Sequence, residues 1–248
     1  MVKKFILIIL FISAIGTESY SQKLEYLNKY WYPVQDTSIY DIFYHRITIE
    51  DSLRKSVRII SLDSMVSYQR IEIKEQKRQP FTKTEVWYND SGNKTMSRSF
   101  SSKKEMEETI KYFDSGRIKS KVVKSNGKVI EESYFSESGQ KIEPPLFISA
   151  LPNGGLQSWT EYLRTNLVYP PAARYSGQEG TVYLHFYVNE KGEMEEIEIM
   201  NPEENHPTLN REALRVIMSY PYLWTPSYED GIAKKSEMRL PINFKLTD

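Results

Sequence analysis

Apolar and polar residues alternate over several short stretches in the first half of the chain. Five stretches are rich in Ile, Val, Tyr and Thr and alternate as half-buried strands do. They cover residues 40–50, 66–74, 82–88, 109–113 and 128–135. The turn signals between them pair a short polar residue with a glycine, which suits tight hairpins. The pattern therefore predicts an antiparallel β meander.

The second half mixes helical and strand patterns. Residues 156–167 place Trp159, Tyr162 and Leu163 on one helical face. A short helix follows between Pro171 and Gly177, and another helix begins at Pro207. Three stretches alternate strictly or nearly so, beginning at residues 181, 194 and 236. The predicted fold class is α+β: a C-terminal three-stranded antiparallel sheet with helices on one face, preceded by the antiparallel β-meander region.

Glycines recur at a regular spacing in the meander. Gly116, Gly127 and Gly139 lie 11 and 12 residues apart, and Gly92 lies 24 residues before Gly116. Together with the preceding tyrosines, this spacing resembles the variant MORN-type repeats (Y-x-x-x-G) of bacterial envelope proteins over about residues 85–141. The alternative, that these are hairpins without a binding role, stays open.

The N-terminus and two breaker segments define the predicted domains. Lys3 and Lys4 precede an apolar run over residues 5–15 and a small-residue cleavage site ending at Ser21. This order is typical of a secretory signal peptide. Prolines and glycines at residues 143–155 indicate a junction. We predict a signal peptide over residues 1–21, a β-rich region over 22–145 and a C-terminal domain over 146–248. The protein is then periplasmic, or anchored in the inner membrane if the signal is not cleaved.

Composition narrows the function. The chain has no cysteine, so disulfides and cysteine lipidation are excluded. Residues 22–248 carry 31 basic and 32 acidic side chains, which argues against a nucleic-acid partner.

The sequence also argues against an enzyme. His45, His185 and His206 are not at metal-ligand spacing, and no cofactor or metal motif is present. We expect His185 on the outward face of its strand and a structural role for His206 at a helix start. Glu195 is expected on the strand face opposite Glu196 and Glu198, which indicates a solvated surface rather than an acid–base pair.

A family resemblance covers roughly residues 150–246. Many separated positions match in order, and together they resemble the TonB C-terminal domain. The resemblance implies a periplasmic domain that binds a short extended segment, the TonB box, of outer-membrane TonB-dependent transporters. The positions are Tyr169, Pro170, Ala173, Gly177, Gly180, Val182, Gly192, Leu209, Ala213, Leu214, Trp224, Thr225, Pro226, Gly231, Pro241 and Phe244.

The last alternating stretch contains Pro241, and proline within a sheet favours a strand with one free side. An extended peptide can add to such an edge, with an affinity near the micromolar range or weaker. The alternative is an edge that binds nothing, and free edges could also pair two copies in a homodimer. The predicted peptide-binding residues are Tyr169, Pro170, Ser236, Glu237, Met238, Arg239, Leu240, Ile242, Asn243 and Phe244.

The chain departs from a complete energy transducer, because a β-rich region replaces the proline-rich spacer and the N-terminal segment reads as cleavable. The predicted function is a periplasmic TonB-like protein that binds TonB-dependent transporters by strand addition in energy-coupled transport. The alternative is a soluble envelope adaptor or structural binding protein without energy transduction, which would bind another envelope protein.

Overall fold

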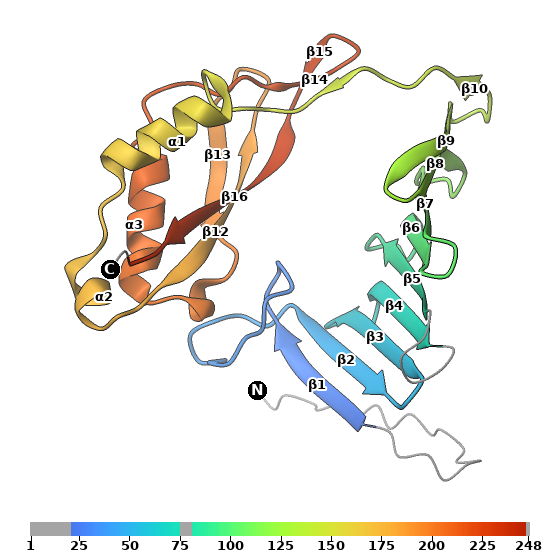
Figure 1. Cartoon of the computed structure of the whole chain (residues 1–248), viewed down its shortest axis with the longest axis horizontal. Coiled ribbons are helices and arrows are strands. Elements are labelled where there is room, and N and C mark those ends of the chain that lie inside the picture. Colours follow the sequence, from blue (N-terminus) through green and yellow to red (C-terminus); the bar gives the residue numbers. More distant parts are fainter. Residues whose placement is uncertain (1–20, 75–80, 247–248) are drawn as a thin grey trace.

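The computed structural model describes residues 21–74 and 81–246, which form an N-terminal sheet and a C-terminal part (Figure 1). Ten strands make up the N-terminal sheet, and each pairs antiparallel with its neighbours in sequence. The predicted signal peptide lies outside the described residues except for Ser21. The strands are β1 (Ser21–Leu27), β2 (Tyr44–Glu50), β3 (Arg54–Ser61), β4 (Val66–Lys74), β5 (Phe81–Tyr88), β6 (Lys94–Ser101), β7 (Met106–Tyr112), β8 (Ile118–Ser125), β9 (Lys128–Phe135) and β10 (Lys141–Ile142).

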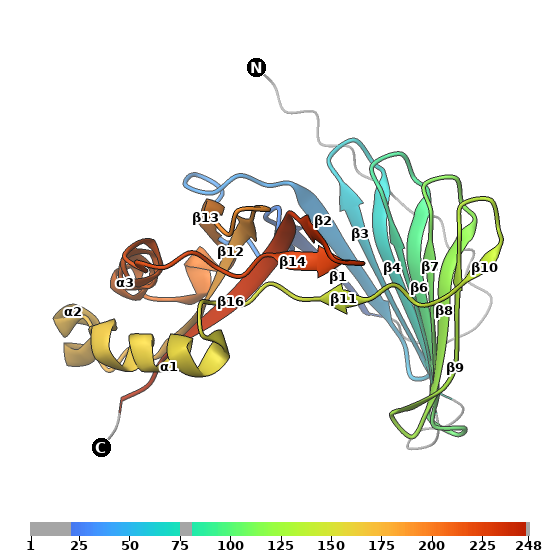
Figure 2. The same cartoon turned by 90° about the horizontal axis from the view of Figure 1, so that it is seen from above.

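The meander predicted from alternation is confirmed, but four of its longer strands escaped the prediction: β1, β3, β6 and β8. The sequence of β6, KTMSRSFS, explains why. The sheet is a single layer without a covering helix among the described residues (Figure 2), and its strand residues are mostly part-buried. A strand with two partly wet faces tolerates Ser, Lys and Arg, so it carries a weak alternation signal.

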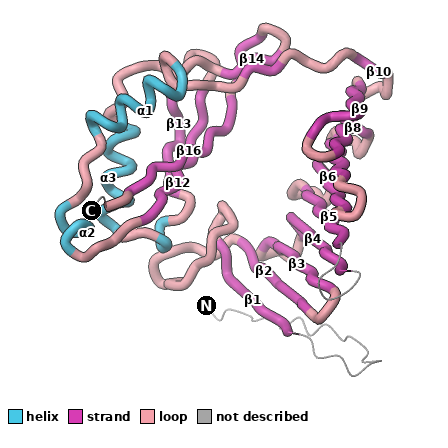
Figure 3. Tube along the Cα trace, viewed as in Figure 1, coloured by secondary structure: helices cyan, strands magenta, loops and turns pink. Residues whose placement is uncertain are grey.

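All described helices lie in the C-terminal part (Figure 3). A three-stranded antiparallel sheet has the order β13-β12-β16. A second, small sheet has the order β11-β14-β15. The elements are β11 (Phe147–Ile148), α1 (Gly155–Asn166), α2 (Pro171–Tyr175), β12 (Gly180–Val188), β13 (Met194–Ile199), the 3-10 helix η1 (Pro202–Glu204), α3 (Pro207–Met218), β14 (Ser227–Glu229), β15 (Ile232–Lys234) and β16 (Ser236–Phe244).

The core of the C-terminal part lies between this sheet and the helices. Every second residue of β12 from Val182 to Val188 is fully buried, as the alternation predicted. Trp159 of α1, Ala173 of α2 and Leu209 of α3 pack into the same cluster. The predicted α+β architecture with helices on one face of the sheet is therefore confirmed. We call the other face of the β13-β12-β16 sheet the open face.

The two parts are joined at two places (Figure 1). The chain passes from β10 to β11 through residues 143–146, close to the predicted junction. Residues 28–36, between β1 and β2, also contact the C-terminal part, for example where Asn28 Nδ2 donates to the carbonyl of Met200 at 2.8 Å. None of the helices formed by residues 21–74 and 81–246 has the length and apolar character that crossing a membrane requires.

Candidate functional site

Strand β16 has one free side among the described residues. It pairs with β12 along its whole length, from Ser236 opposite Val188 to Phe244 opposite Gly180. No described strand pairs with its other side. The prediction of an edge strand over residues 236–245 is thus confirmed.

Backbone contacts show which groups point to the free side. The Tyr183 N–H donates to Asn201 Oδ1 at 2.9 Å, and its carbonyl accepts from the Met200 N–H at 2.8 Å. Tyr183 therefore directs its backbone groups toward β13. Its antiparallel partner Pro241 must then direct its own groups away from β12, so the missing proline N–H costs no bond within the sheet.

The alternation of backbone direction extends this result along β16. Glu237, Arg239 and Asn243 share the direction of Pro241. The free edge hence offers three N–H groups and four carbonyls, with a gap in the donors at Pro241. The side chains of Glu237, Arg239 and Asn243 stand on the open face, whereas Met238, Leu240, Ile242 and Phe244 face the core. The backbone groups of those four residues and of Ser236 point toward β12, so these residues hold the edge strand in the sheet and offer no backbone group to a peptide.

Tyr169 lies at the C-terminal end of β16. Its ring meets the Phe244 ring edge-on with the centroids 5.8 Å apart, and its hydroxyl donates to the Gln178 carbonyl at 2.6 Å. Pro170 caps the start of α2. A shallow open pocket at this end of the edge is lined by Glu179, Gly180, Thr181, Asn243, Phe244 and Lys245.

Glu212 of α3 fixes the chain that leads into Tyr169, and the sequence analysis missed it. Its carboxylate accepts the Val168 N–H at 2.7 Å and two bonds from the Arg215 guanidinium at 2.7 and 2.6 Å. Burial opposes ionisation, but the Arg215 bonds and the Val168 N–H outweigh it and hold the pKa of Glu212 below its ordinary value. The Glu–Arg pair at i, i+3 is visible in the sequence, but its contact with Val168 is not.

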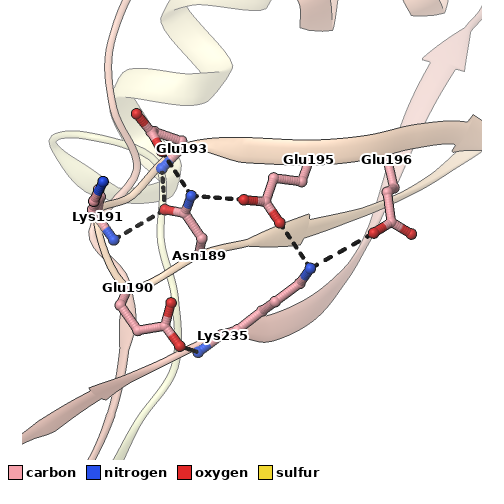
Figure 4. Close-up of polar contacts among 7 residues, drawn as sticks. All are labelled: Asn189, Glu190, Lys191, Glu193, Glu195, Glu196 and Lys235. Atoms are coloured by element: carbon pink, nitrogen blue, oxygen red, sulfur yellow. Dashed lines mark hydrogen bonds and ion pairs between the residues drawn. The ribbon is translucent and has the colours of Figure 1, made fainter.

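A polar network holds the other end of β16 (Figure 4). The Lys235 ammonium lies 2.7 Å from Glu195 and 3.6 Å from Glu196, and the Lys235 N–H donates to Glu190 at 3.1 Å. Asn189 ties the β12–β13 turn to Glu195 at 2.8 Å. These contacts connect the turn to the residue that immediately precedes β16.

The predicted faces of β13 are wrong in one respect. The register between β12 and β13 shifts because Glu196, at a φ of 54°, forms a bulge. Glu195 pairs with Tyr187 and Glu198 pairs with His185, so the bulge brings Glu195 and Glu198 to the same face. A strict period of two cannot anticipate a bulge.

The histidines have structural surroundings. His206 caps α3, since its Nδ1 accepts the Thr208 N–H at 3.3 Å. His185 stands on the open face as predicted, yet only 7% of it is exposed because Tyr30 covers it. Residues 21–74 and 81–246 contain no group of three or more His, Asp or Glu that could hold a metal ion. The absence of enzymatic activity stays a prediction.

In a comparison with known protein families, residues 165–246 match the family described as "Gram-negative bacterial TonB protein C-terminal". The match covers helices α2 and α3 and the whole β13-β12-β16 sheet, including the edge strand. It supports the resemblance drawn from the sequence for this part, whereas the MORN-type resemblance of the meander is not confirmed. Neither the curated proteins nor the solved structures gave a match to the chain.

Proposed function

We propose that this is a periplasmic, TonB-like envelope protein whose C-terminal part binds an extended segment of outer-membrane TonB-dependent transporters. The segment adds as a fourth strand to β16. The observation that carries the proposal is the free edge of β16, with seven outward backbone groups, within the part that the TonB C-terminal family matches.

The edge predicts a modest affinity. Seven backbone bonds at about 0.5–1.5 kcal/mol each supply a gross gain of roughly 3.5–10 kcal/mol. Association and ordering cost on the order of 4–15 kcal/mol, which side-chain contacts must help to offset. A dissociation constant near the micromolar range or weaker follows. Such a contact forms and releases repeatedly, as a coupling protein requires.

The test is a calorimetric titration of the protein with a synthetic peptide that spans the TonB box of a transporter from the same bacterium. Arg239→Ala removes the side chain, and Arg239→Pro also removes one outward N–H without touching a bond to β12. We expect Arg239→Pro to bind about 2- to 13-fold more weakly than Arg239→Ala, the equivalent of one net hydrogen bond. Equal affinities for the two variants, or no binding at all, would contradict strand addition at this edge.

Energy coupling is the finer part of the proposal. It requires a link to the inner membrane, which an uncleaved N-terminal segment would supply. Intact mass and membrane partition of the protein from its native envelope decide between the two arrangements. A mass beginning at Gln22, in the soluble periplasmic fraction, would leave the adaptor without energy transduction; a retained N-terminus in the inner-membrane fraction would support the transducer.

A further inference from the structure

The two outer strands of the β13-β12-β16 sheet differ in regularity. Strand β16 pairs with β12 over 9 residues without a register shift. Strand β13 has 6 residues, and the bulge at Glu196 interrupts its register with β12. A bulge hinders pairing with another chain, whereas a long regular edge is a template for it. On β16 the corresponding interruption is the missing N–H of Pro241.

A single added strand loses one hydrogen bond at this proline. The four residues with outward backbone groups are all exposed: Glu237, Arg239, Pro241 and Asn243. An extended segment beside them can pair with three N–H groups and four carbonyls of the edge. The segment carbonyl that meets Pro241 finds no donor there and stays in contact with water. The segment therefore forms seven of the eight bonds that four outward residues would otherwise give.

Two copies of β16 lose twice as much when they pair with each other. A closed pair of identical edges has a two-fold axis perpendicular to the sheet, so its strands run antiparallel. The longest pairing that joins outward groups is centred on Leu240, and it places Arg239 of each copy opposite Pro241 of the other. The same register places Glu237 opposite Asn243. Because the proline occurs twice, six bonds form and two carbonyls lack a donor.

Other registers do not recover this loss. Within β16, every other symmetric register that joins outward groups forms four bonds or fewer. One of these registers places Glu237 of each copy opposite Arg239 of the other. The gain from that ion pair is small, because Arg239 already pairs with Glu237 of its own strand at 2.9 Å and both side chains are well exposed.

We propose that Pro241 is a specificity-determining residue of the edge, which favours the addition of one extended foreign segment over pairing with a second copy of β16. The proline removes one bond from the first complex and two from the second. The identity of the foreign segment rests on the proposed function, whereas the penalty on self-pairing does not. Since the Pro241 nitrogen points away from β12, a residue with an N–H can replace it without changing a bond within the sheet.

The test replaces the proline and measures both kinds of pairing. Pro241→Thr supplies the missing N–H on a β-branched residue that suits a strand. Sedimentation equilibrium of the full chain over a range of concentrations measures self-association, and calorimetric titration with the TonB-box peptide measures binding of the segment. We expect self-association to strengthen about 5- to 160-fold, the equivalent of two net hydrogen bonds, and peptide binding to strengthen about 2- to 13-fold, the equivalent of one.

A matched variant controls for the change of side chain. Pro241→Thr combined with Arg239→Pro moves the gap by two residues and restores the original number of outward donors. This double variant should self-associate no more strongly than the unsubstituted protein. Amide exchange locates the contact: in Pro241→Thr the outward amides of Glu237 and Asn243 should become protected as the protein concentration rises. Unchanged exchange of α3 would show that each variant is folded, and Pro241→Ala offers the same N–H with a smaller side chain.

The possible outcomes separate this proposal from the proposed function. Equal self-association of Pro241→Thr and the unsubstituted protein would overturn the proposal, as would a gain in self-association no larger than the gain in peptide affinity. If neither protein binds the peptide, the proposed function is contradicted. The self-association of Pro241→Thr would then still decide whether the proline disfavours pairing of two β16 strands.

Discussion

Two glycines in equivalent turns make it possible to separate two costs of replacing glycine by alanine: the strain of a left-handed backbone and the clash of the new Cβ atom with a neighbour. Gly192 ends the turn between β12 and β13, and its N–H donates to the Asn189 carbonyl at 3.0 Å. Gly139 ends the turn between β9 and β10, and its N–H donates to the Ser136 carbonyl at 2.9 Å. Their φ angles are 86° and 88°. We predict that alanine is far more harmful at Gly192 than at Gly139.

The structure gives the magnitude of the difference. An alanine Cβ at residue 139 meets nothing within 4 Å, so only the left-handed conformation costs, about 1–2 kcal/mol. At residue 192 the Cβ would lie 2.0 Å from the carbonyl oxygen of Trp224. Trp224 must retreat, which breaks the 2.8 Å bond from its N–H to the Gly192 carbonyl. Leaving such buried groups unpaired costs a further 1–3 kcal/mol or so, for a total of about 2–5 kcal/mol.

Segment-resolved hydrogen exchange is the suitable assay, because the two turns lie in different parts of the protein. Opening free energies of α3 report on Gly192→Ala, and those of β8 report on Gly139→Ala. If both variants lose the same 1–2 kcal/mol or so, the Trp224 segment yields without cost and the steric reasoning is refuted.

Three further changes test other contacts. Glu212→Gln should lower the unfolding free energy of the C-terminal part by about 1–3 kcal/mol at pH 7. The folded-state pKa of Glu212 is lowered, so the unsubstituted protein should lose this contribution as the pH falls below about 5 and through that pKa. The urea midpoint of the variant should therefore depend less on pH over this range than that of the unsubstituted protein. Phe186→Ala, in the centre of the core, should cost about 3–5 kcal/mol by urea unfolding, and a loss below about 1 kcal/mol would contradict the packing. Asn201→Ala removes the partner of the Tyr183 N–H, so that amide should exchange faster while amides of β7 do not change.

The sequence pattern correctly predicted those strands whose position depends on neighbouring residues in the chain. The bounds of β4 and β9 follow from alternation and turn residues alone, and the edge position of β16 follows from Pro241, since a proline N cannot donate within the sheet. The contact of residues 28–36 with the C-terminal part could not be predicted, because Tyr30 and Glu198 lie 168 residues apart and neither carries a local signature of the other. The contact of Glu212 with Val168 was missed for the same reason, although the residues are only 44 apart.

The meander has a mechanical consequence, because each of its ten strands pairs only with its neighbours in the chain. Such a sheet is close to one-dimensional, so strands can unzip from one end while the rest keeps its order. Removing one hairpin would shorten the row by roughly 10 Å, two inter-strand spacings, and leave the remaining pairings intact. The number of strands therefore sets the distance between β1 and β10. That distance decides whether residues 28–36 can reach the C-terminal part.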